Sequence, residues 1–304
     1  MHILIAGASG LIGQRLIPIL QHAGHQVSVL STQDNPNTFS TSISSFHWSP
    51  EKGKIDINAL NGVEVIINLA GATVAQRWTA KNKKAIFESR VLGTRLLAES
   101  LKNSNHNVSH FISASAIGVY PAHPDTIYTE TSTLISQDFL GQLVHAWENE
   151  VDSLLGVVPH CSKIRIGLVL AKEGGALIPL ALPASFGFGA WFGSGKQWQS
   201  WIHIDDIARL FVFALEHPGC YNGVAPNPIS QKNLIKAIAR VYNKPQWLPG
   251  IPKVVLQLGM GAMSKILYDS ICVSSAYAVT KGFSFQFSTI EEALNDLLPL
   301  GAKK

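Results

Sequence analysis

Cysteine is scarce in this sequence, and its three copies lie far apart. Cys161, Cys220 and Cys272 are odd in number and contain no Cys-x-x-Cys pair. That pattern fits neither a disulfide framework nor a cysteine-based zinc site. We therefore expect a reducing compartment and no bound metal.

Charge and unbroken apolar stretches are also in short supply. Only 14% of the residues are charged, the net charge is +4, and Lys and Arg are scattered without a dense run. Neither nucleic acid nor a membrane surface is therefore an expected partner. The most apolar later stretch, 176–193, is interrupted by Pro179, Pro183, Gly187 and Gly189, which argues against a membrane span. Because the first strand pattern begins at the second or third residue, we expect no presequence and a cytoplasmic location.

What the chain has in quantity is apolar side chains, at 46% of 304 residues. That is enough for one large domain, or for one domain with a smaller lobe.

The first thirteen residues, MHILIAGASGLIG, carry the most specific pattern. The run 3–6 predicts a buried strand, and apolar residues at helical spacing follow the turn. Between them stand Gly7, Gly10 and Gly13: the first permits a tight turn, the second a close approach to a pyrophosphate, and the third close packing of helix on strand. Unpaired N–H groups at the helix start attract an anion, so the turn is a candidate dinucleotide-phosphate site.

The rest of the first half alternates between strand and helix patterns. This alternation predicts an α/β fold of the Rossmann type, a doubly wound parallel sheet, with a smaller C-terminal substrate lobe. A polar loop is expected at 31–45. The expected strands are 27–30, 63–69, 110–114 and 163–170, and the expected helices are 79–102 and 138–155.

The rhythm changes after residue 170, where glycine-rich loops and short pieces are expected up to residue 200. Helices are predicted at 204–216 and 231–241, with a further apolar helix near 254–266. We expect residues 1–170 to form the dinucleotide-binding domain, with 204–225 returning to it. The smaller lobe would then comprise 171–203 and 226–304.

Two strand ends carry small or hydroxyl-bearing residues at the edge where ligands bind in parallel sheets. NLAGA at 68–72 would allow adenosine to approach the backbone, or is simply a tight turn. Ser115, within SASAIGVY at 113–120, could hydrogen-bond a substrate oxygen, or merely cap the strand.

Taken together, GxxGxxG, NLAGA, SASAIGVY and WIHIDD (201–206) resemble the extended, atypical short-chain dehydrogenase/reductase superfamily. The order of RWT (77–79), SRV (89–91), GGAL (174–177) and GSGKQWQSWIHIDD (193–206) narrows the resemblance. It is similar to an NAD(P)-binding, sugar-nucleotide epimerase-like family with a C-terminal lobe of unknown function.

The resemblance implies NADP as cofactor, with NAD not excluded. Arg90 occupies a position where many relatives have Asn beside the cofactor, although a surface ion pair with Glu88 or Glu99 would also account for it. The resemblance further implies a small-molecule ligand and leaves a homodimer open. The implied cofactor-binding residues are Gly7, Ser9, Gly10, Leu11, Ile12, Gly13, Thr32, Leu69, Ala70, Gly71, Arg90 and Ser113.

The sequence departs from the family at the end of the second strand. An acidic residue there binds the ribose of NAD, and an arginine accepts the 2′-phosphate of NADP. Nearer relatives usually have Arg where this chain has Thr32, and Asp34 comes two residues later. Thr32 therefore weakens the NADP prediction.

A second departure concerns proton transfer. The superfamily carries Tyr-x-x-x-Lys on the helix after the fifth strand, where lysine lowers the pKa of the phenol that exchanges a proton with substrate. Here that helix contains Phe139 and no such pair. Ser115 and Tyr120 are the remaining catalytic candidates, and His145 is a weaker one because it suits an exposed helix position.

The smaller C-terminal lobe also departs from the family's pattern. Relatives that bind nucleotide sugars have an arginine after the GxGxQ turn, where this chain has Gln199, and Lys196 cannot supply a bidentate fork. Trp191, Phe192, Trp198 and Trp201 suit an apolar pocket or a packed interface.

Two hypotheses follow. One is an NADP-dependent oxidoreductase or epimerase-like protein of atypical mechanism acting on a small molecule. The other is a catalytically silent NAD(P)(H)-binding sensor or partner-binding protein.

Overall fold

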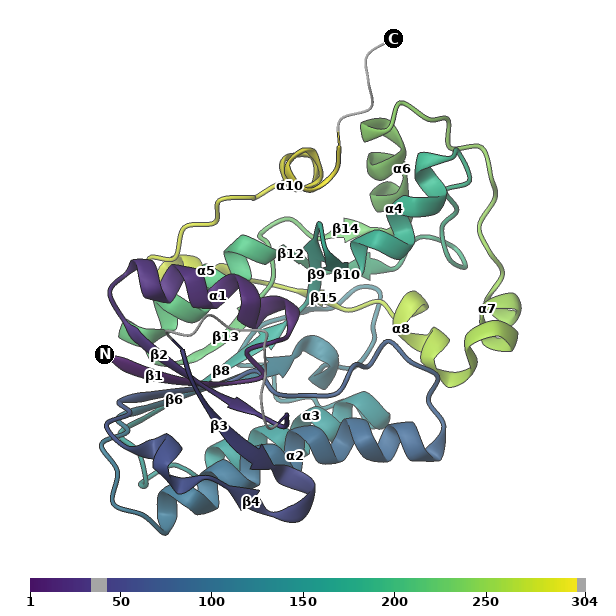
Figure 1. Ribbon diagram of the computed structural model, residues 1–304. Helices are drawn as coiled ribbons and strands as arrows, with labels where there is room; N and C mark the ends of the chain where they lie inside the picture. Colours follow the sequence, from purple (N-terminus) through teal and green to yellow (C-terminus); the bar gives the residue numbers. More distant parts are fainter. Residues whose placement is uncertain (34–42, 300–304) are drawn as a thin grey trace.

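The computed structural model describes residues 1–33 and 43–299, which are built around an eight-stranded sheet (Figure 1). The strand order is β13-β8-β6-β5-β1-β2-β3-β4, with every neighbouring pair parallel except β3 and β4. The strands are β1 (His2–Ala6), β2 (Gln26–Ser31), β3 (Ser44–Ser49), β4 (Lys54–Ile55), β5 (Val65–Asn68), β6 (His110–Ala116), β8 (His160–Ile166) and β13 (Cys220–Gly223).

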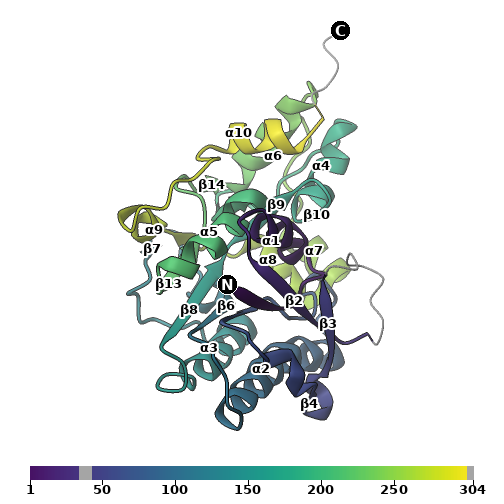
Figure 2. The same cartoon turned by 60° about the vertical axis from the view of Figure 1, so that its left-hand side comes forward.

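Helices cover both faces of this sheet, which is why its central strands are almost wholly apolar. Ile3, Leu4 and Ile5 of β1 have no exposed surface. Helices α1 (Leu11–His22) and α5 (Ile204–Glu216) pack together on one face, and α2 (Ala80–Lys102) and α3 (Phe139–Asp152) pack together on the other (Figure 2). The chain moves outward in opposite directions from β1 and β5, so a ligand crevice is expected at their carboxyl ends.

Strands β3 and β4 are absent from the prediction, which ran from a loop at 31–45 directly to the strand at 63–69. Their polar sequence explains the error, because Trp48 is the one buried residue of β3 and β4 has none. Residues 34–42 of that loop, Asp34 among them, lie outside the described residues.

The single strand predicted at 163–170 is two strands. Gly167 separates β8 from β9 (Leu168–Ala171), and a methyl group there would lie 2.3 Å from the Ser200 carbonyl oxygen. Beyond Gly167 the chain joins a separate sheet of order β10-β9-β12, with β10 at Gly174–Gly175 and β12 at Trp201–His203.

The remaining residues form mainly helices beside the sheet. The stretch 171–200, expected as loops, contains α4, and the helix predicted near 254–266 is divided by a 3₁₀ turn. Residues 204–225 supply α5 and β13 to the main sheet, while the predicted division into domains stays a prediction. The further elements are α4 (Leu177–Ser185), α6 (Gln231–Val241), α7 (Lys253–Met260), α8 (Lys265–Tyr268), α9 (Ala276–Thr280), α10 (Ile290–Leu297), β7 (Ile127–Tyr128), β11 (Trp198–Gln199), β14 (Ile229–Ser230), β15 (Cys272–Val273) and 3₁₀ turns at Pro50–Lys52, Ile57–Leu60, Ile117–Val119 and Gly261–Ser264.

Within 1–33 and 43–299, no helix is both long and apolar enough to cross a membrane. The same residues contain no cluster of three His, Cys, Asp or Glu side chains suited to a metal ion.

Candidate functional site

The turn between β1 and α1 needs glycine for steric reasons. Gly7 has φ +80°, and a methyl group there would lie 2.6 Å from the Leu69 carbonyl carbon. At Gly13 a methyl group would lie 2.5 Å from the Ala8 carbonyl oxygen, so helix and strand could not pack as they do. The turn is therefore held tightly against the end of β5.

The N-terminus of α1 is left open to a ligand. Gly10 occupies the N-cap position and offers no side-chain oxygen, and the first turn contains no acidic residue. Helix N-termini carry N–H groups without intrahelical partners, together with the positive end of the helix dipole. A pyrophosphate group fits this arrangement of backbone donors.

A cleft of about 490 Å³ opens beside this turn, at the carboxyl ends of β1, β2 and β5. Gly7, Ser9, Thr32, Ala70 and Gly71, all predicted cofactor-binding residues, line it together. The other lining residues are Leu30, Ser31, Gln33, Trp48, Ser49, Pro50, Glu51, Ala72 and Ser89.

Arg90 lies behind the β5 side of this cleft. Its Nη1 donates to the carbonyl oxygens of Ala72, at 2.9 Å, and Ile86, at 3.2 Å. A methyl group at Gly71 would lie 3.0 Å from Nη2 and 3.1 Å from Nε, so these atoms face the cleft wall. The alternative of a surface ion pair with Glu88 or Glu99 is wrong, because the guanidinium is turned inward and burial lowers its pKa to about 10.

The serines at the end of β6 are buried. Ser113 has no exposed surface, and its Oγ donates to the Ala114 carbonyl oxygen. Ser115 is 3% exposed, and its Oγ donates to Glu148 Oε1 at 2.5 Å. A Ser115 hydroxyl that already donates to a carboxylate can only accept a further hydrogen bond.

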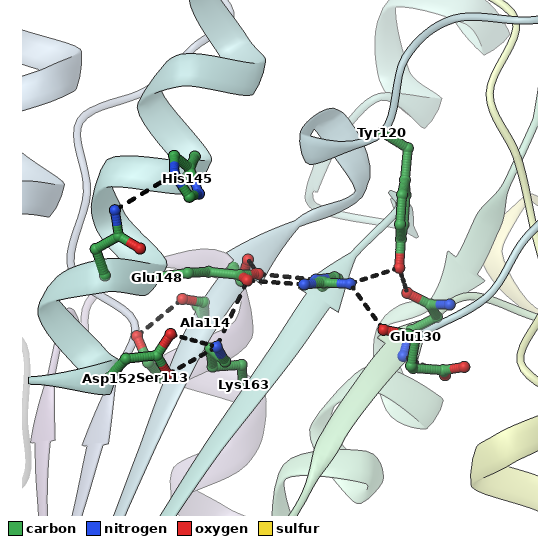
Figure 3. A network of polar contacts seen from close by, with 12 residues as sticks. Ser113, Ala114, Tyr120, Glu130, His145, Glu148, Asp152 and Lys163 are labelled. Atoms are coloured by element: carbon green, nitrogen blue, oxygen red, sulfur yellow. Dashed lines mark hydrogen bonds and ion pairs between the residues drawn. The ribbon is translucent and has the colours of Figure 1, made fainter. Parts of the chain in front are cut away.

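Glu148 on α3 is the centre of a buried polar network that runs across the sheet from β6 to β13 (Figure 3). Arg165 on β8 holds it with two hydrogen bonds of 2.8 Å, from Nε to Oε1 and from Nη2 to Oε2. Lys163 Nζ lies 3.7 Å from Oε2 and also pairs with Asp152. Burial alone would raise the pKa of Glu148, but Arg165 and the Ser115 hydroxyl hold that pKa below its ordinary value.

Tyr120 closes the other end of this network. Its hydroxyl receives a 2.8 Å hydrogen bond from Arg165 Nη1 and donates to Asn222 Oδ1, also at 2.8 Å. The residue is 1% exposed, and burial raises its pKa to about 12. Its ring stacks on Tyr128, which makes Tyr120 a packed component of the fold.

Helix α3 corresponds to the helix that carries the tyrosine–lysine pair in relatives. Here other residues occupy its first turns. Asp138 caps it by accepting from the Gly141 N–H, and Lys265 of α8 donates to the same carboxylate. Phe139 packs edge-on against Trp78, with Lys83 Nζ 5.2 Å from the Phe139 ring centre. His145 is exposed.

The second-lobe tryptophans do not gather into one pocket. Trp201 is fully buried and bonds the Asn227 carbonyl, Trp191 lies under Lys232, and Trp198 is 37% exposed. Gln199 pairs in a short strand with Ile229.

The motif HIDD at 203–206 is structural. His203 is the N-cap of α5, and Asp205 is an acidic residue of its first turn. Asp206 is fully buried and accepts from the backbone N–H groups of Gln286 and Phe287. The motif therefore fixes the C-terminal segment.

Comparison with known proteins agrees with this arrangement. Residues 3–138 match the NAD dependent epimerase/dehydratase family, and residues 251–297 match a domain of unknown function, DUF1731. The chain is 35% identical over 301 residues to the epimerase family protein YfhF of Bacillus subtilis, covering 98% of both chains. The chain belongs to this epimerase family. The predicted family and Rossmann-type fold are thus confirmed.

Two solved structures extend the likeness of this epimerase-family chain. The human epimerase family protein SDR39U1, solved with NADPH, is 26% identical with a TM-score of 0.84, covering 98% of this chain and 99% of its own. A nucleoside-diphosphate sugar epimerase from Corynebacterium glutamicum is 29% identical with a TM-score of 0.78, covering 98% of this chain and 58% of its own.

The sequence did not predict that Glu148 binds the Ser115 hydroxyl or that Arg165 binds the Tyr120 hydroxyl. Glu148 stands on the apolar face of its helix, beside Trp147 and between Val144 and Val151, and Arg165 stands between Ile164 and Ile166 in β8. Placing a carboxylate or a guanidinium at such a position costs free energy unless the two form a pair. A charged residue within each apolar pattern could therefore have indicated the pair from the sequence.

Proposed function

We propose that this epimerase-family chain binds an NAD(P)(H) dinucleotide, with the pyrophosphate at the N-terminus of α1 and the adenosine half in the adjoining cleft. The observation that carries the proposal is the uncapped helix start at Gly10 beside a cleft of about 490 Å³. The NADPH in the structure of the human relative supports the same class of ligand. The residues predicted for the cofactor are the ones proposed to hold it, with Leu11, Ile12 and Gly13 offering backbone N–H groups. Ser113 is the exception, because it is fully buried and its hydroxyl donates to the Ala114 carbonyl oxygen.

Arg90 supports the phosphate-binding role. The part-buried Arg90 guanidinium contacts carbonyl oxygens and the Trp147 ring and has no carboxylate partner among the described residues, so a bound anion would stabilise it. Its Nε and Nη2 face the wall at Gly71, so we assign them to the pyrophosphate or the neighbouring ribose.

We further propose that the chain is an oxidoreductase, or an epimerase-like protein, acting on a small molecule. The nicotinamide would supply the hydride chemistry. Ser115 would orient a substrate hydroxyl by accepting its hydrogen bond, because its own proton is committed to Glu148. The described part of α3 provides no Tyr-x-x-x-Lys, so the proton released from that hydroxyl would pass to water.

A silent dinucleotide-binding protein is the second candidate. Tyr120 and Ser115 favour it, since both hydroxyls are buried and bonded within the network rather than directed into the cleft. The missing phenol–lysine pair favours it as well.

Two measurements test these proposals together. Titration of NADH and NADPH against tryptophan fluorescence or by calorimetry should give saturable binding, and Arg90→Met should weaken it about tenfold through loss of a charge-assisted contact. Arg95→Met, on the same helix but paired with Glu150, is the control and should bind normally. Absence of binding to either dinucleotide would disprove the proposed site.

The reaction is tested by following absorbance at 340 nm with aldehydes, ketones and nucleotide sugars. Turnover that depends on the protein supports the enzyme. Binding without oxidation of the dinucleotide across the panel rejects it in favour of the silent protein.

A further inference from the structure

Thr32, just after β2, and Glu51, in the 3₁₀ turn after β3, both line the cleft. We infer that Thr32 and Glu51 make the cleft select NAD(H) over NADP(H), an inference that rests on the proposed dinucleotide site. In a doubly wound sheet the residue at the tip of the second strand meets the adenosine ribose. Thr32 stands directly after β2 and lines the cleft. Its neighbours Ser31 and Gln33 also line the cleft.

The described residues that line the cleft include no Lys, Arg or His. The fifteen residues from Ser31 to Ser45 contain no Lys, Arg or His. Among the described residues that line the cleft, Glu51, in the 3₁₀ turn after β3, is the one of a charged type. A 2′-phosphate carries close to two negative charges and would meet a carboxylate here instead of a guanidinium.

Arg90 lies too far away to take over that role. It sits behind Gly71, beyond the end of β5, whereas Thr32 follows β2. Because β1 lies between β5 and β2 in the sheet, the two strand ends are about 10 Å apart. The guanidinium is also held in place by the Ala72 and Ile86 carbonyl oxygens. Arg90 therefore serves the pyrophosphate half of the cleft.

The groups that are present suit the free hydroxyls of NAD. Thr32, Gln33 and Ser49 line the cleft with neutral side chains that can donate or accept a hydrogen bond. The carboxylate of Glu51 can accept from a ribose hydroxyl, which is how an acidic residue selects NAD in Rossmann domains. Both features favour an unphosphorylated ribose.

The direct test measures the dissociation constants of NADH and NADPH for the full chain by calorimetry at low salt. NADH should bind at least about tenfold more tightly than NADPH, equivalent to one charge-assisted contact. Equal or tighter binding of NADPH would overturn the inference while leaving the dinucleotide site intact. Failure to bind either dinucleotide would instead overturn the proposed function itself.

Substitutions identify the residues responsible. Thr32→Arg should tighten NADPH about tenfold, leave NADH within about threefold, and lose this gain as salt is raised. Thr32→Gln is the matched control, since it adds length without charge and should not improve NADPH binding. Glu51→Gln should improve NADPH binding a few-fold through removal of the repulsive charge. If Thr32→Arg and Thr32→Gln behave alike, charge at this position does not set the preference and the inference fails.

Discussion

Glu148 shows how a single side chain can organise the carboxyl end of a sheet. It is 6% exposed, yet it remains ionised because Arg165 supplies a bidentate partner and Ser115 a third donor. Burying a charge is tolerated only with such complete pairing. The residue thereby links α3, β6 and β8 at one point.

Removing the charge of Glu148 should destabilise the fold in a pH-dependent way. Glu148→Gln leaves the Arg165 guanidinium without a counter-charge and should lower the free energy of unfolding at pH 7 by about 3 kcal/mol. Because the folded-state pKa of Glu148 is lowered, its contribution is complete above the ordinary glutamate pKa and is lost as pH falls through the folded-state value. Urea unfolding between pH 7 and pH 3 measures both effects.

Glu88→Gln is the control for this measurement, since within 1–33 and 43–299 the ion-pair partner of Glu88 is the exposed Lys84, also on α2. Its effect should stay below about 0.5 kcal/mol. A destabilisation by Glu148→Gln that is small, or that is equally large at pH 3, would contradict the assigned role of the ion pair.

For single residues, the sequence predicts where a polar side chain lies better than it predicts which residue that side chain contacts. Ser115 could be located because it ends an apolar strand within SASAIGVY. Its acceptor lies 33 residues later and is brought there only by the packing of α3 on the sheet. Glu88 and Glu99 lie on the same helix as Arg90, but the guanidinium is turned inward beneath Gly71 and pairs with neither.

Among the elements, the turn between β1 and α1 could be predicted because its constraints are local. Strand, glycine spacing and helix follow one another within twenty residues. β3 could not be predicted, since its sequence SSFHWS is mostly exposed and its place is fixed by pairing with β2. The break at Gly167 depends on Ser200, a contact between distant parts of the chain.

Substitution of Gly7 should show that this turn is constrained by space as well as by its backbone angle. Gly7 and Gly24 both have φ +80°, but a methyl group at Gly24 meets nothing within 4 Å. Gly24→Ala should therefore cost about 1 kcal/mol for the left-handed conformation alone. Gly7→Ala adds a clash with the backbone of Leu69 and Ala70, so it should cost about 3 kcal/mol or more.

Chemical denaturation of the two variants measures this difference, and dinucleotide titration adds a functional reading. Gly24→Ala should bind as the parent does, whereas Gly7→Ala should lose binding through displacement of the turn. If both substitutions lower the free energy of unfolding equally, the left-handed backbone conformation alone accounts for the loss.

At the scale of the whole molecule, the C-terminal segment is held against helices that cover the main sheet. Asp206 accepts the N–H groups of Gln286 and Phe287, and the His203 ring stacks on Phe287 at 3.7 Å. Lys265 reaches across to Asp138 at the start of α3. These contacts join residues 265–287 to two helices of the main sheet.

Loss of the Asp206 carboxylate should release that segment. Asp206→Ala leaves two buried N–H groups without acceptors, which should cost about 1–3 kcal/mol. Hydrogen exchange should then rise in 285–298 before it rises in β1 or β5. Asp205→Ala is the control, because it removes the partly exposed pair with Arg15 and should cost no more than about 1 kcal/mol. Uniform acceleration of exchange throughout the chain would contradict a local fastening.

The strand order also affects how this protein avoids aggregation through the edges of its sheet. An edge strand with free backbone groups invites pairing with another chain. One edge here is β4, only two residues long and beginning with Lys54. At the other edge, β13, the Asn222 N–H is taken by Glu130. A second copy could extend the sheet at β13 only after displacing that carboxylate, so the chain carries its own protection against edge-to-edge aggregation.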